Sequence, residues 1–254
     1  MTWLLWRRHR VPAVCLLVWL AATLAVFASV GGPLNPARRP VGVLPVYFLL
    51  AMGNVPVLLG MFVGAPLFAR ELAAGTHRLV LTQGVTHRRW VAANLGLVLA
   101  VALGAAVIVG LAGALVLDDS LRFGASAGGF SRWQGFDQQG PAFVSHVAFA
   151  LALGIAAGAV VGNTLPAILI TFAGNGAVGT IVSVVRPHYL PPLRGAPPVI
   201  GGPYLDVDWG YYGIVSYQPP DRFWTFQAIE AAIFAVLAAL LVAFAIWCVR
   251  RRLT

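Results

Sequence analysis

Six long apolar stretches divide this sequence, and they contain no Asp, Lys or Arg and a single Glu. A helix rises about 1.5 Å per residue, so about 20 apolar residues cross the roughly 30 Å hydrocarbon layer of a membrane. Each stretch reaches that length. Because backbone groups in lipid must be satisfied within the segment, each stretch is predicted to be a helix. The stretches are residues 11–31, 43–69, 91–117, 141–162, 164–185 and 223–249.

The composition excludes a sizeable soluble domain. Only 10% of the 254 residues are charged, whereas soluble domains carry roughly 25%. The charged residues gather in short islands between the apolar stretches. The sequence therefore predicts an all-α integral membrane protein, with residues 1–254 forming a single transmembrane domain of six helices.

Residues 162–166 mark the boundary between the fourth and fifth stretches. A single helix over 141–185 would be roughly 65 Å long, about twice what a bilayer needs. Gly162 and Asn163 suit the end of one helix, Thr164 suits the N-cap of the next, and Pro166 suits its first turn. Two spans joined by a tight hairpin are expected.

The basic charge sets the orientation. With the N-terminus inside, the cytoplasmic islands hold ten arginines and the outer segments seven, a positive-inside bias that places both termini in the cytoplasm. The net charge of +9 thus faces anionic lipid rather than nucleic acid. All 17 basic residues are arginine, so a phosphate-binding loop of the form G-x-x-x-x-G-K-[ST] cannot exist in this chain.

The cytoplasmic segment 70–90, between spans two and three, carries the most information about function. Glu71 directly follows span two and is the only acid in the predicted cytoplasmic islands. Apolar residues recur at helical spacing over 72–83, which predicts a short amphipathic helix. Gly84 would end that helix, and Thr86 could cap the next one.

This segment resembles the coupling segment of bacterial type-2 ABC exporter permeases. The resemblance rests on Arg70-Glu71-x-x-x-Gly75-Thr76, then Leu79, Leu81 and Thr82, then Gly84-Val85-Thr86-x-Arg88. Gly84 stands where many members have proline, which leaves the turn possible. Residues 1–10 also resemble the interfacial helix that precedes the first span in that family.

The resemblance implies a transport subunit of the plasma membrane without an active site or bound cofactor of its own. ATP and Mg²⁺ would bind a separate cytoplasmic ABC ATPase subunit. A second permease chain, identical or not, would complete the pathway for an apolar or amphiphilic substrate. The residues implied to couple to the ATPase are Glu71, Gly75, Thr76, Arg78, Leu79, Leu81 and Thr82.

Three polar residues lie inside predicted spans and are candidate functional positions: His146, Asn175 and Glu230. An acid within a span indicates a functional site by default. His146 and Glu230 lie at similar depth, so a contact between them is allowed. Glu230 could instead extend to the water-filled outer mouth. Asn175 could line a cavity or hydrogen-bond a neighbouring helix.

Backbone-level features complete the prediction. Gly154, Gly158 and Gly162 recur at four-residue spacing and favour close helix packing within the chain, or else a dimer or cavity seam. Pro45, Pro56 and Pro66 should kink span two. The proline-rich segment 186–223 is expected to be an extracellular re-entrant region or a surface loop.

A different class of function, a membrane-embedded enzyme or an assembly protein with no ATPase partner, remains the alternative. A membrane hydrolase would need catalytic groups clustered in or beside the spans. The histidines are isolated along the sequence, and no metal-ligand spacing such as H-E-x-x-H occurs. No metal site is therefore predicted.

Overall fold

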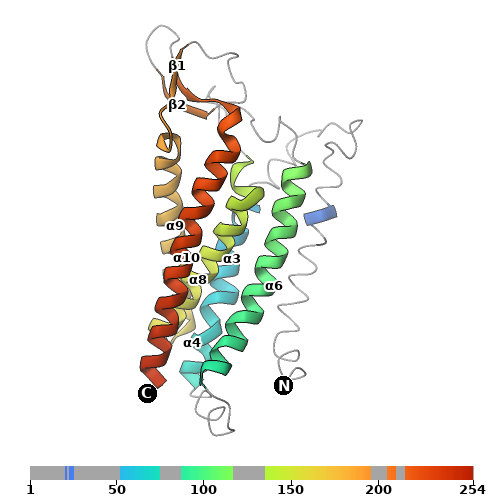
Figure 1. Cartoon of the computed structure of the whole chain (residues 1–254). Helices are drawn as coiled ribbons and strands as arrows, with labels where there is room; N and C mark the ends of the chain where they lie inside the picture. The colour runs from blue at the N-terminus through green and yellow to red at the C-terminus, as the bar shows by residue number, and fades with distance from the viewer. Residues whose placement is uncertain are drawn as a thin grey trace.

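The structure, a computed structural model, describes residues 21, 23–25, 52–74, 87–116, 135–195, 205–209 and 215–253. This part of the chain is mostly helical and forms an elongated bundle with a small sheet at one end (Figure 1). Nearly all of predicted span one lies outside the described residues, as do most of the coupling segment and the N-terminus. Six spans and the placement of the termini therefore stay predictions.

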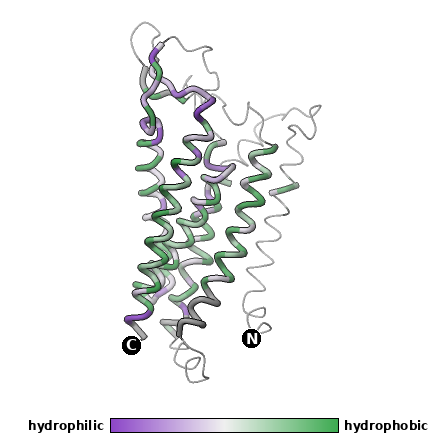
Figure 2. Tube along the Cα trace, viewed as in Figure 1, coloured by the Kyte–Doolittle hydropathy of each residue, from purple (hydrophilic) through white to green (hydrophobic). Residues whose placement is uncertain are grey.

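Four described helices are long and apolar enough to cross a membrane. Hydrophobic residues run along most of their length, and hydrophilic ones gather toward the ends and the sheet (Figure 2). The prediction of apolar helices long enough to span a bilayer is confirmed for these four. They are α6 (His87–Val116), α8 (Gly140–Val161), α9 (Thr164–Val185) and α10 (Phe223–Leu253).

The region of predicted span two is a helix made of three consecutive pieces. These are α3 (Val55–Leu59), the π-helical turn η1 (Gly60–Gly64) and α4 (Ala65–Ala74). Among the described helices, only this one contains a π-turn. The end of α4, the start of α6 and the end of α10 lie at one end of the bundle, and the sheet lies at the other (Figure 1).

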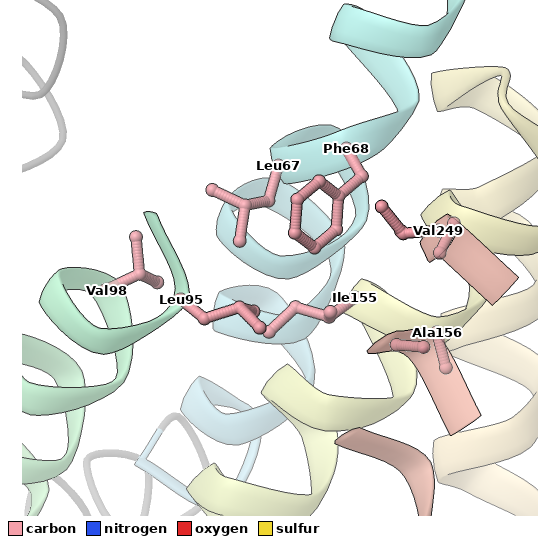
Figure 3. Close-up of a cluster of buried hydrophobic side chains, with 9 residues drawn as sticks. Leu67, Phe68, Leu95, Val98, Ile155, Ala156 and Val249 are labelled. Carbon is pink, nitrogen blue, oxygen red and sulfur yellow. The ribbon is translucent and has the colours of Figure 1, made fainter. Parts of the chain in front are cut away.

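Helix α8 forms the centre of the bundle. It packs against η1, α3, α4, α6, α9 and α10. In its most apolar window 67% of residues are buried, compared with 11% in α9, so α9 is peripheral within this chain. One cluster shared by α4, α6, α8 and α10 includes Leu67, Phe68, Leu95, Val98, Ile155, Ala156 and Val249 (Figure 3).

Helices α8 and α9 are joined by the tight turn expected from the sequence. Gly162 ends α8 in the left-handed conformation (φ 68°), which glycine adopts without a steric penalty. The cap of α9 differs from the prediction, because Asn163 rather than Thr164 is the N-cap. The Asn163 side chain accepts a hydrogen bond from the Leu165 amide.

The end of the bundle opposite the C-terminus of α4, which is the predicted outer end, carries a small antiparallel sheet, so an all-α description is incomplete. Strands β1 (Leu193–Gly195), β2 (Leu205–Trp209) and β3 (Val215–Gln218) pair in the order β1-β3-β2. Each strand is five residues or shorter. Because the strands lie in a proline-rich segment, their short extended pattern was not recognised in the sequence. Three single-turn helices border this region: η2 (Phe136–Gln138), η3 (Arg186–His188) and η5 (Pro220–Arg222).

Candidate functional site

The predicted coupling residues fall mostly outside the described part of the chain. Glu71 lies in the last turns of α4, where the structure describes its backbone only. The other six lie in the undescribed stretch 75–86: Gly75, Thr76, Arg78, Leu79, Leu81 and Thr82. Their role stays a prediction.

The two ionisable residues predicted inside spans meet near the predicted outer end of the bundle. Glu230 on α10 is completely buried. Its Oε1 lies 2.9 Å from Nε2 of His146 on α8. An ionised carboxylate only accepts hydrogen bonds, so the Nε2 of His146 carries the proton in this contact. The His146 ring also packs edge-on against Phe234 of α10.

Arg186, at the end of α9, supplies the charge that balances Glu230. Its Nε donates to Glu230 Oε2 at 2.8 Å, and its Nη2 donates to Glu230 Oε1 at 2.7 Å. The planar guanidinium thus binds both carboxylate oxygens, the geometry for which arginine is suited. Nη2 also donates to Asp137 in η2, and the centroid of the Phe136 ring lies 4.2 Å from the guanidinium carbon.

Tyr189, just beyond η3, completes this outer cluster of Asp137, His146, Arg186, Tyr189 and Glu230. Its hydroxyl donates a hydrogen bond to Glu230 Oε2 at 3.3 Å. Burial and the neighbouring Glu230 carboxylate both raise the pKa of the Tyr189 hydroxyl, so it stays protonated and remains a donor.

The outer cluster joins segments far apart in the sequence. Glu230 is 44 residues from Arg186 and 84 from His146, and Arg186 is 49 from Asp137. Through these contacts the outer ends of α8, α9 and α10 are held together. The side chain of Asp137 is 40% exposed, which places the cluster at the boundary between bundle and solvent.

The cluster does not fit a metal ion as it stands. Ligand atoms of Asp137, His146 and Glu230 lie within 4.8 Å of one another. However, the Arg186 guanidinium donates to both carboxylates. A divalent cation would have to share these oxygens with a positive group already bound to them, so the arrangement is an ion-pair network.

A second polar network fastens the outer sheet to the bundle. The buried side chain of Gln218, at the end of β3, donates to the carbonyls of Pro187 and Leu190. Arg222 donates to Gln218 Oε1 and to the Pro191 carbonyl. These contacts tie the segment leaving α9 to the segment entering α10.

Gln227 on α10 also links separate segments by hydrogen bonds, deeper in the bundle. It accepts from the Ala142 amide at 3.0 Å and donates to the Phe136 carbonyl at 2.6 Å, thereby joining α10 to the start of α8. Sequence reasoning missed Arg186, Asp137, Tyr189 and the glutamines. The available signal was that a buried Glu230 requires a cation, and Arg186 directly follows span five.

The remaining predicted residues have different environments. Gly154 and Gly158 face η1 and α4 so closely that a Cβ would collide with the carbonyl of Gly60 or Ala65. Gly162 instead ends α8. Asn175 is half-buried near the middle of α9.

Comparison with known families gives one result that covers more than half of the chain. The model of the family described as ABC-2 membrane transporter related matches residues 37–186. The match includes the segment 70–90 and ends at Arg186. A search of curated proteins and a search of solved structures find no significant match. With its long apolar helices and this match, the chain belongs to the ABC-2 membrane transporter related family.

Proposed function

We propose that this chain is the membrane-spanning subunit of an ATP-driven exporter. A separate cytoplasmic ABC ATPase would bind and hydrolyse ATP, and two permease chains would form the pathway in the plasma membrane. The observation that carries the proposal is the family match over residues 37–186, which includes the motif-bearing segment 70–90.

The packing around α4 supports a coupling role for the segment that follows it. Leu67 and Phe68 of α4 lie in one buried cluster with residues of α6, α8 and α10 (Figure 3). Interiors packed in this way transmit displacement rather than absorb it. A force applied at residues 72–83 would therefore act on four helices at once.

The character of the described spans favours an apolar or amphiphilic substrate. Glu230, the one acid more than a turn inside a described span, is already bound to Arg186 and His146. Large apolar side chains face outward from α9 and α10, among them Phe172, Ile181 and Leu240. Such surfaces bury apolar groups favourably and give a strongly charged substrate little to bind.

Photo-crosslinking from the coupling segment tests this proposal. A photoreactive residue replaces Arg78 or Leu81 in the full chain, and cells are irradiated before membranes are solubilised. The expected product contains an ATPase subunit that carries the lysine of a phosphate-binding loop. The same residue at Gly195 on β1, at the opposite end of the bundle, serves as the control. Capture of the ATPase from Gly195 but not from positions 78 and 81 would contradict the proposal.

A further inference from the structure

The helix that leads to the coupling segment changes its geometry halfway along. The Ala65 amide donates to the carbonyl of Gly60, five residues earlier, instead of to Met61. Pro66, the next residue, has no amide proton. The Met61 carbonyl therefore receives neither the α-type nor the π-type hydrogen bond that a helix would offer it. The backbone ladder is weakest at this point of the helix.

One face of the same turn meets α8 through glycine backbone, while Val63 packs beside it against side chains of α6 and α8. A Cβ at Gly60 would collide with the Ala150 carbonyl, and one at Gly64 would lie 2.7 Å from the Leu151 carbonyl. From the other side, a Cβ at Gly154 would collide with the Gly60 carbonyl. Two glycine-lined surfaces thus face each other, with few side chains to oppose a small rotation or slide.

Beyond the turn, the contacts are of a different kind. Leu67 and Phe68 of α4 are 6% and 1% exposed and pack among side chains of α6, α8 and α10. Helix α4 then continues to Ala74 and so includes the first three residues of the predicted coupling helix, 72–83. A change at η1 would therefore reach the coupling segment through a single continuous helix.

We propose that η1 (Gly60–Gly64) is a joint at which α4 moves relative to α3 during transport. The proposal rests on the proposed exporter function. A π-turn holds one residue more than an α-turn, and such turns often mark functional positions. Full relaxation to α geometry would advance the following helix by about 1.5 Å and rotate it by roughly 100°. During transport the joint undergoes only part of this advance and rotation, and the packed side chains of Leu67 and Phe68 transmit it to the neighbouring helices.

Pro66 is the residue whose replacement separates a joint from a static kink. Pro66→Ala restores an amide proton and removes the ring that disfavours the α-type ladder, and the substitution is favourable for helix stability. The expected result is retained ATP hydrolysis with loss of transport. Pro56→Ala is the matched control. Pro56 lies in the first turn of α3, where a backbone amide has no acceptor within the helix, so the absent amide proton of proline loses no helix hydrogen bond. This control should transport normally.

Distances between spin labels provide a readout that does not depend on activity. One label replaces the exposed Ala73 on α4 or the exposed Leu58 on α3, and the second replaces Ile181 on α9 in both pairs. Cys15 and Cys248 are first changed to serine. In the complex with the ATPase, the 73–181 distance should shift between nucleotide-free and vanadate-trapped states. The 58–181 distance should stay the same, and Pro66→Ala should abolish the shift.

The outcomes distinguish the joint from the exporter function. If the native complex hydrolyses ATP and transports while both distances stay unchanged or shift equally, the joint is refuted and the exporter function stands. Normal transport by Pro66→Ala with an undiminished 73–181 shift also refutes the joint. If no ATPase assembles with the native chain, the exporter function fails, and the joint fails with it.

Discussion

Removing the positive charge at Arg186 should destabilise the protein strongly, because the outer cluster holds two carboxylates around one guanidinium. In Arg186→Gln, Glu230 would stay fully buried with only His146 and Tyr189 as hydrogen-bond partners. Breaking a buried ion pair by removing one partner costs about 3–5 kcal/mol. Asp137 is 40% exposed and can be solvated, so its contact adds little. We expect a loss near the lower bound, about 3 kcal/mol.

Thermal unfolding in detergent measures this loss; it is followed, in a background with Cys15 changed to serine, with a thiol-reactive dye that labels Cys248. For a chain of this size about 3 kcal/mol corresponds to a midpoint lower by roughly 6–12 °C. Arg194→Gln, the same substitution at an exposed arginine on β1, is the control and should change the midpoint little. The double variant Arg186→Gln/Glu230→Gln leaves no unpaired buried charge, so it should be more stable than Arg186→Gln alone. A midpoint for Arg186→Gln equal to that of Arg194→Gln would refute the reasoning.

Three further predictions follow from packing, coupling and orientation. Gly158→Val should lower the unfolding midpoint or prevent folding, because its side chain would collide with the Ala65 carbonyl. Gly176→Ala should be tolerated, because nothing lies within 4 Å of its added Cβ. Thermal unfolding in detergent compares the two variants. Glu71→Ala removes the only acid of segment 70–90, which the structure places in the last turns of α4, and Gly75→Val strains a turn if its φ is positive. Both variants should insert normally yet lose ATPase co-purification or coupling, and normal binding and transport by both would reduce segment 70–90 to an ordinary loop. Cysteines at positions 2 and 254 should resist a membrane-impermeant thiol reagent in intact cells, and efficient labelling of either would exclude the six-span orientation.

The helices were predictable because their cause is local. An uncharged stretch long enough to cross a bilayer has few alternatives to a helix, and Gly162 with Asn163 marks the turn between α8 and α9. The choice of Asn163 over Thr164 as the cap was not predictable, since both residue types cap well. The prolines indicated a kink in span two, and the π-turn ends at Gly64, two residues before Pro66.

Only part of the outer cluster was predictable from the sequence, because its contacts depend on how helices distant in sequence pack together. Glu230 and His146 were visible as polar residues within spans, and the structure brings them into hydrogen-bond contact. Arg186 was counted among the outer arginines that set orientation, and Asp137 among the outer acids. Which arginine reaches Glu230 depends on how α9 and α10 pack against α8, and no local pattern encodes that. The short strands were missed because each is five residues or shorter and lies in a proline-rich segment.

ATP-driven movement of an amphiphile by the reconstituted complex tests the central claim most directly. The chain and its co-purified ATPase are placed in proteoliposomes that contain a fluorescent lipid analogue, and Mg-ATP is added from the side exposing the ATPase. Transport should require ATP and should stop when the lysine of the phosphate-binding loop in the ATPase is replaced, while the permease remains folded and bound. Transport that continues without hydrolysis, or hydrolysis that never moves any amphiphile, would contradict the assignment of this chain as the membrane-spanning subunit of an ATP-driven exporter.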